Sequence, residues 1–499
     1  MKLKKLFLFA TTLLMCASTF VSCADGGGMA NMGAMMDAYM PEMGMEEEDY
    51  TEIIENEFIK ASEQPSSYFS IDANTASYPN LRSLINMNAN IPKDAVRVEE
   101  MLNYFDYDYA TPEGEDILAL TSSVFDTPYN AETKILTVGL AAKEVEFTEQ
   151  QNNIVFLIDV SGSMNSTDKL PLVQASFSML AENLNAEDRV SIVTYAGADK
   201  VALDGAYGYE KKKIVGTIED LSAGGSTAGS KGIRTAYSLA EKYFIEGGNN
   251  RVILATDGDF NVGLTALEDL ENYISRKRNS GVYFSVFGFG RGNIKSDKME
   301  TLALNGNGTY SYIDSINEAK RALVTNIGGT MLTVAKDVKA GIVFNPDYID
   351  SYRLIGYENK LLTQEEFEDD TTDAGELGSG HTVTVAYEIK LTDKALGSEE
   401  NFAQVTIKYK PTENSGGASD ISKETLLDVK TSAYHEVLTA QDAFIASVIE
   451  FALILRNSAY KGDANITDLI DRLNALTLED EFKTEFRDLV KTYYSHTLE

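Results

Sequence analysis

The sequence predicts an α/β fold: a doubly wound parallel sheet inserted between β-sandwich-like flanking segments, followed by a helical C-terminal region. Three observations predict it. From residue 153 onward, strand-like and helix-like segments alternate, which is typical of a parallel sheet with helices on both faces. Residues 154–158 are continuously apolar, as expected of a strand that is covered on both faces. The segments before 150 and after 330 are β-like, and residues 432–495 are helix-like.

The elements expected inside the α/β region alternate from its first strand to its last helix. Strands are predicted at residues 154–158, 189–195, 201–203, 251–256, 282–287 and 308–313, and helices at residues 169–184, 211–221, 229–244, 266–279, 297–305 and 316–327. Outside this region, strands are predicted at residues 117–124, 133–140, 334–344, 351–357, 382–391 and 402–409, and a helix near residues 96–105. The flanking strands could form one sandwich, with the α/β domain inserted into it.

The composition favours a multidomain protein with an acidic surface. At roughly 100–200 residues per domain, the 499 residues correspond to about two to four domains. The formal net charge of -34 repels nucleic acid phosphates and suits cations and basic partners. We divide the chain into six parts. The first three are a signal peptide (residues 1–22), a flexible tether (23–64) and an N-terminal helix-then-β region (65–150). The α/β domain (151–330), a β-rich region (331–430) and a helical C-terminal region (431–499) follow.

The N-terminus has the features of an export signal. Lysines near the start precede a short apolar stretch, residues 6–15, that is too short to span a membrane. The segment Phe20-Val21-Ser22-Cys23 resembles a bacterial lipobox, although Phe20 differs from the usual aliphatic residue. The resemblance implies cleavage before Cys23 and attachment of a diacylglycerol to its sulfur. Since Cys16 would leave with the signal, the mature chain would keep one cysteine, and lipidation would explain it.

Residues 24–50 have the composition of a flexible tether. Glycines and methionines alternate with small residues, an acidic run follows at residues 46–49, and no apolar period is sustained. A methionine-rich tract could also bind a soft metal such as Cu(I), but no histidine accompanies it. With a lipid on Cys23, we expect the protein in a bacterial cell envelope, at the outer membrane, on its periplasmic face or at the cell surface.

Oxygen-bearing side chains follow the first strand of the α/β region. Residues 154–158 run directly into Asp159-Val160-Ser161-Gly162-Ser163. In open α/β sheets, ligands bind beyond the carboxyl ends of strands, near a switch in strand order. One carboxylate and two hydroxyls are hard donors that suit Mg²⁺, Mn²⁺ or Ca²⁺ and suit zinc or copper poorly. The alternative is a strand-to-helix turn in which a serine caps the helix.

Two further segments extend this pattern. Gly224-Gly225-Ser226-Thr227 lies in a loop before a predicted helix, and a second apolar strand, residues 251–256, ends in Asp257-Gly258. Together with Asn165, Asp168 and Lys169, these segments resemble the metal-ion-dependent adhesion site of von Willebrand factor type A domains. The flanking regions resemble those of a bacterial lipoprotein family that carries such a domain, at residues 68–78, 96–105, 354–359 and 458–463.

The resemblance implies a role for each matching residue. Ser161, Ser163 and Thr227 would supply hydroxyl oxygens to a metal ion, and Asp159 and Asp257 would act directly or through bound water. Magnesium prefers near-octahedral coordination and keeps waters readily. One position would be left for an Asp or Glu carboxylate of a partner protein. The expected function is that of a lipid-anchored envelope protein that binds protein ligands through Mg²⁺, with Mn²⁺ or Ca²⁺ as alternatives.

Enzymatic activity has little support in the sequence, and we assign no catalytic residue. The three histidines, His381, His435 and His496, lie outside the α/β domain, so no general base accompanies the serines of its first loop. A metal with an open position could activate water, which leaves a metal-dependent hydrolase as a minor alternative. Type A domains also work with ATPase partners, so an envelope assembly scaffold is the main alternative.

Two segments imitate other binding motifs. Residues 257–268 resemble a calcium-binding EF-hand loop, but Val262 stands where the sharp turn needs a glycine. Residues 224–231 resemble a phosphate-binding loop, but Ser230-Lys231 is in the wrong order. We interpret both as parts of the α/β domain.

Two apolar clusters are expected to be buried. The aromatic residues at 104, 105, 107 and 109 would mark an interface if they were exposed, and burial against the sandwich is favoured. Residues 444–455 are too few to span a membrane and contain Glu450, which predicts a buried helix.

Overall fold

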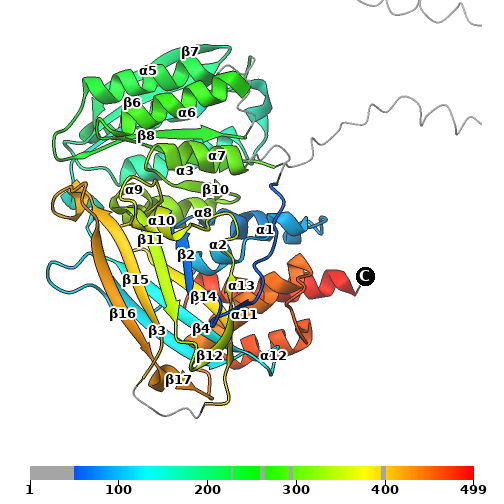
Figure 1. The fold of residues 1–499 in the computed structure, drawn as a ribbon. Coiled ribbons are helices and arrows are strands. Elements are labelled where there is room, and N and C mark those ends of the chain that lie inside the picture. The colour runs from blue at the N-terminus through cyan, green and yellow to red at the C-terminus, as the bar shows by residue number, and fades with distance from the viewer. Residues whose placement is uncertain (1–49, 226–228, 259–263, 292–295, 395–399, 499) are drawn as a thin grey trace, which may run out of the picture. The chain divides into compact units, whose positions relative to one another are not determined.

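The computed structural model describes residues 50–225, 229–258, 264–291, 296–394 and 400–498. The α/β domain contains a six-stranded sheet with the order β10-β9-β8-β5-β6-β7. Figure 1 labels β7, β6, β8 and β10 of this sheet. Its strands are β5 (Asn152–Asp159), β6 (Arg189–Ala196), β7 (Ala198–Tyr207), β8 (Asn249–Thr256), β9 (Val282–Phe289) and β10 (Tyr310–Ile313). Neighbours are parallel except β6 and β7. Because β6 and β8 lie on opposite sides of β5, the strand order reverses there, where such sheets bind ligands.

Helices cover both faces of this sheet. On one face, α3 (Leu170–Glu182), α4 (Lys211–Glu219) and α8 (Ile316–Lys320) share a core with Ile154, Phe156 and Ile158 of β5. On the other face, α5 (Gly229–Lys242), α6 (Leu264–Arg278) and α7 (Ser296–Asn305) share a core with Val155 and Leu157. Successive side chains of a strand point to opposite faces, so both sets of β5 residues are buried. The prediction of a doubly covered strand is therefore confirmed.

The last helix of the domain differs from its prediction. The single helix expected at residues 316–327 is divided into α8, a π-helical turn η5 (Arg321–Thr325) and α9 (Ile327–Met331). The backbone N–H of Asn326 donates to the carbonyl of Arg321 at 2.7 Å, which is the wide spacing of a π-turn. The apolar pattern of residues 316–327 indicates a helix but carries no sign of this irregularity.

The flanking β segments form two sheets with one shared core. The first has the order β1-β12-β14-β4-β3-β17, and the second has the order β13-β11-β15-β16, with β2 paired to β11. Core residues come from both sheets, including Leu136 and Val138 of β4 and Ile342 of β11. The bounds are β1 (Ile59–Lys60), β2 (Ser66–Ser70), β3 (Leu118–Asp126), β4 (Lys134–Ala142), β11 (Thr333–Phe344), β12 (Ile349–Ile355), β13 (Gly375–Gly378), β14 (Thr382–Leu391), β15 (Asn401–Pro411), β16 (Lys423–Lys430) and β17 (Tyr434–His435). Segments on both sides of the α/β domain thus build one sandwich, as predicted.

A helical region packs beside the sandwich. Its main helices are α1 (Ser77–Asn86), α2 (Val98–Asn103), α11 (Ala440–Arg456), α12 (Ile466–Ala475) and α13 (Glu481–Thr497). Shorter helical segments are η1 (Lys93–Ala95), η2 (Phe147–Glu149), η3 (Gly162–Asn165), η4 (Gly208–Glu210), α10 (Gln364–Glu368), η6 (Glu413–Ser415) and η7 (Thr431–Ala433). The region joins residues from both ends of the described chain in one apolar core.

The aromatic cluster after α2 is buried, as favoured, but its main partners are helices. Tyr104, Phe105 and Tyr107 lie in the same core as α11 and α13. The Phe105 ring centroid lies 5.0 Å from that of Phe444 and 5.5 Å from that of Phe486. Tyr109 reaches the sandwich, where its hydroxyl lies 2.7 Å from Thr384 Oγ1.

The prediction of a buried helix at residues 444–455 is confirmed. These residues lie in α11, and almost all of them are buried. Thr439 caps the helix by accepting a hydrogen bond from the N–H of Asp442. No helix in the described ranges combines the length and the apolar character that a membrane crossing requires.

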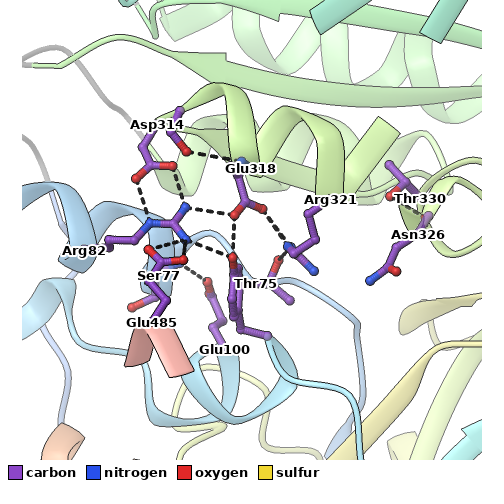
Figure 2. Close-up of polar contacts among 12 residues, drawn as sticks. Thr75, Ser77, Arg82, Glu100, Asp314, Glu318, Arg321, Asn326, Thr330 and Glu485 are labelled. Atoms are coloured by element: carbon purple, nitrogen blue, oxygen red, sulfur yellow. Dashed lines mark hydrogen bonds and ion pairs between the residues drawn. The ribbon is translucent and has the colours of Figure 1, made fainter. Parts of the chain in front are cut away.

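A buried charge network joins the α/β domain to the helical region (Figure 2). Arg82 of α1 donates to Asp314 at 2.9 and 2.6 Å and to Glu318 of α8 at 2.9 Å. Glu318 also accepts from the Tyr104 hydroxyl at 2.7 Å and from Arg321 at 2.9 Å. Burial alone would raise the pKa of Glu318, but Arg321 and Arg82 lower it below its usual value. The Glu318 carboxylate is therefore charged, and the contact between the α/β domain and the helical region depends on its cationic partners, Arg82 and Arg321.

Candidate metal centre

The two aspartates expected to bind metal lie at the same edge of the sheet. Asp159 is the last residue of β5, and Asp257 directly follows β8, the strand beside β5. Asp159 is fully buried and Asp257 is 1 % exposed. Their carboxyls are close enough that Asp257 contributes to raising the pKa of Asp159. The structure therefore brings both residues to the point where the strand order reverses.

The loop after β5 holds its serines against Asp159. The backbone N–H of Ser161 donates to Asp159 Oδ1 at 2.8 Å. The Ser161 and Ser163 hydroxyl oxygens lie 3.0 Å apart. Ser161 is buried, whereas Ser163 is exposed to solvent. The two hydroxyls thus form a contact pair that begins beside the buried Asp159 carboxyl, at Ser161, and ends at the protein surface, at Ser163.

A second loop supports this arrangement through the backbone. Gly224 N–H donates to the Val160 carbonyl at 2.7 Å, and Gly162 N–H donates to the Gly225 carbonyl at 3.1 Å. Gly225 has a φ of +95°, in the left-handed region that favours glycine. The segment that precedes Thr227 is therefore fixed against the first loop. Thr227 itself lies outside the described residues, as does Cys23.

The carboxyl of Asp159 is in a low-dielectric environment. Burial raises its pKa to about 6, hydrogen bonds from Ser161 oppose the rise, and neighbouring Asp257 adds to it. The hydroxyl of Tyr195 also lowers the pKa of this carboxyl, but less than burial raises it. A buried carboxylate is costly when its charge is not balanced, and a bound cation would supply the balancing charge.

The donor set fits a hard divalent cation. Within the described ranges, no group of three or more His, Cys, Asp and Glu side chains is placed to hold a metal ion. A cation at this edge would therefore depend on the serine hydroxyls as well as on the two carboxylates. A set of oxygen ligands that contains only two carboxylates is suited to Mg²⁺, because this ion keeps several of its bound waters. Asp159, Ser161, Ser163 and Asp257 are the described residues that would hold it.

Two neighbours of the site have roles that the sequence did not assign. Tyr195, at the end of β6, is register-paired with Asp159, and its buried hydroxyl interacts with that carboxyl. Lys169 places its ammonium nitrogen 2.8 Å from Asp257 Oδ2. The position of Tyr195 at the carboxyl end of the adjacent strand was the available signal. Lys169 was part of the motif found in the sequence, but its contact with Asp257 joins residues of separate loops and had no sequence signal.

The described histidines lie in other parts of the fold. His435 belongs to β17, and its Nε2 lies 2.8 Å from Asp442 Oδ2 at the start of α11. His381 precedes β14, and burial lowers its pKa to about 4. His496 is on α13.

Three family models match the chain. The model of the von Willebrand factor type A domain matches residues 153–325, which coincide with the α/β domain. The chain carries a von Willebrand factor type A domain. A second model, described as von Willebrand factor, matches residues 44–137, and a third, for the C-terminal part of the uncharacterized protein YfbK, matches residues 329–495. The type A domain is thus flanked on both sides by segments with family models of their own.

Two curated proteins and one solved structure are similar to large parts of the chain. The chain is 39 % identical over 383 residues to the uncharacterized protein YfbK of Escherichia coli (strain K12), covering 75 % of this chain and 65 % of that protein. It is 26 % identical over 209 residues to the uncharacterized protein sll0103 of Synechocystis, covering 40 % and 47 %. The chain therefore spans less than two thirds of the length of these relatives. The solved structure of a von Willebrand factor type A protein from Catenulispora acidiphila covers 74 % of this chain and 84 % of its own, at 15 % identity and a TM-score of 0.41.

Proposed function

We propose that the type A domain binds Mg²⁺, with Mn²⁺ or Ca²⁺ as alternatives, and through it an Asp or Glu carboxylate of a partner protein. The type A domain by itself supports a general role in protein interaction. The observation that carries the metal proposal is the convergence of two buried carboxyls, those of Asp159 and Asp257, with the paired serine hydroxyls at the carboxyl ends of β5 and β8.

Calorimetric titration of residues 24–499 with Mg²⁺, Mn²⁺ and Ca²⁺ tests this proposal. We expect one saturable site, and at least about tenfold weaker binding in Asp159→Asn, because an amide replaces the charged oxygen at constant size. Thr227→Ala should weaken binding as well. The same variants, used as baits in pull-downs with and without chelator, should lose any partner whose capture requires Mg²⁺.

Asp188 provides a matched control, because it lies at the opposite end of the strands, directly before β6. Asp188 is as deeply buried as Asp159 and accepts hydrogen bonds from the N–H groups of Asn152 and Asn185 at 2.8 and 2.7 Å. Asp188→Asn should therefore leave metal affinity unchanged. Binding that survives in Asp159→Asn, or that is lost equally in both variants, would contradict the proposed site. Capture of an ATPase instead of a surface ligand would favour an assembly scaffold.

We further propose that Cys23 carries a lipid that holds the protein at the bacterial envelope. The lipobox-like segment before it supports this proposal. Cys23→Ser should move the protein from the membrane fraction to the soluble fraction, because a lipid anchor contributes most of the membrane affinity. Unchanged fractionation, or an unmodified Cys23 by mass spectrometry, would rule out the anchor.

A further inference from the structure

Lys169 is an unusual residue to find at its position. It occupies the N-cap of α3, directly before Leu170. The N-terminus of a helix carries a partial positive charge, so a lysine there is disfavoured by the helix dipole. The side chain is also withdrawn from water, with 10 % of its surface exposed. Neither helix formation nor solvation accounts for a buried cation at this place.

The contacts of Lys169 direct its charge into the candidate metal centre. Its ammonium nitrogen lies 2.8 Å from Asp257 Oδ2, and the Asp257 side chain is fully buried. Its aliphatic stem runs across Gly290, where a Cβ would lie 2.4 Å from Lys169 Cγ. Gly290 also has a φ of +77°, so this close approach and the backbone conformation both favour glycine. The absence of a side chain at Gly290 thus leaves the space that the Lys169 side chain occupies on its way to Asp257.

We propose that Lys169 is a tethered cation that neutralises the site when no metal is bound and leaves Asp257 when a divalent ion enters. The inference rests on the metal site proposed above and adds a means of regulating it. Removing one partner of a buried ion pair leaves an uncompensated buried charge, which is destabilising. Asp257 therefore keeps a counter-charge in the metal-free protein, and the loops keep their arrangement. A metal ion that takes Asp257 Oδ2, the oxygen that Lys169 now contacts, would displace the lysine, so the lysine would weaken metal affinity.

The charge of Lys169 can be removed at nearly constant shape by Lys169→Met. We expect the affinity for Mg²⁺ to rise at least about tenfold in calorimetry, and the metal-free variant to melt at a lower temperature than the wild type. The rise in melting temperature on adding Mg²⁺ should be larger in the variant. Lys169→Arg keeps the charge and should keep the weaker affinity. Lower or unchanged affinity in Lys169→Met would overturn the proposal.

Lys410→Met is the matched control, because Lys410 forms a similarly enclosed ion pair with Asp337, also at 2.8 Å. It should lower the melting temperature without changing Mg²⁺ affinity.

The wild type offers a test without any variant. Mg²⁺ should increase the labelling of Lys169 by an amine-reactive reagent, and a chelator should reverse this increase. The labelling of Lys410 should not change. Saturable Mg²⁺ binding with unchanged Lys169 labelling would refute the tethered cation alone. Absence of binding in both the wild type and Lys169→Met would refute the metal site as well.

Discussion

Replacing Arg82 by Met is expected to lower the free energy of unfolding by about 3–5 kcal/mol, the cost of removing one partner from a buried ion pair. Arg82 is 3 % exposed, and its two main partners, Asp314 and Glu318, are 7 % and 1 % exposed in their side chains. Glu318 would retain Arg321 and the Tyr104 hydroxyl. The carboxylate of Asp314 would lose both of its hydrogen bonds from Arg82. Urea unfolding at neutral pH measures the effect.

A surface pair provides the control for this experiment. Lys242 Nζ and Asp204 Oδ2 lie 2.8 Å apart, a distance similar to those of the Arg82 pairs, but about half of each side chain is exposed. Lys242→Met should leave the urea midpoint nearly unchanged, because exposed pairs are screened by solvent. An Arg82→Met protein as stable as the wild type would show that the network in Figure 2 does not hold the α/β domain to the helical region.

Stability is expected to fall as the pH rises from about 5 to about 8, and Glu100→Gln should remove much of this fall. Burial, followed by the influence of Glu300, raises the pKa of Glu100 to about 8, and burial together with Glu358 raises that of Glu99 to about 7. Each folded pKa lies above the ordinary value of 4.5. The stabilising contribution of each group is therefore complete below about pH 4.5 and is lost as the pH rises through its folded pKa.

Glu100→Gln stays neutral at every pH and can still accept the hydrogen bond that Ser77 N–H donates at 2.8 Å. Its advantage over the wild type should grow with pH and reach on the order of 2 kcal/mol near pH 8. Urea unfolding at a series of pH values gives this difference directly. The exposed Glu113, replaced in the same way, should leave the pH profile unchanged. Parallel pH profiles for Glu100→Gln and the wild type would mean that Glu100 is ionised in the folded protein.

The sequence could predict features that depend on neighbouring residues. The continuous apolar run before Asp159 is a local pattern, and so is the second run before Asp257. Since parallel strands align their carboxyl ends, the proximity of these two carboxyls was a consequence of the expected fold. The burial of residues 444–455 followed in the same way from their length and composition.

Features set by distant contacts or by weak patterns could not be predicted. β13 has four residues, two of them glycine, and β16 has no regular alternation of apolar and polar residues, with Leu426 62 % exposed. Their strand conformation is imposed by pairing with β11 and β15. The contacts of Arg82 with Asp314 and of Lys169 with Asp257 likewise join residues that no local period connects.

The insertion of the type A domain affects the order in which the chain can fold. Leu140 pairs with Val383 and Ser70 with Lys339, so the sandwich closes across the whole inserted domain. The entropic cost of closing a loop increases with its length. In the part of the chain that the structure describes, the strands of the type A domain pair only with one another, so this domain can form before the rest of the chain is available. Its two ends meet at one turn: Gly380 N–H donates to the Lys143 carbonyl, and Ser379 N–H to the Leu332 carbonyl. Once folded, the domain replaces a long flexible loop by a short fixed connection, and it thereby lowers the entropy that the sandwich loses when it closes.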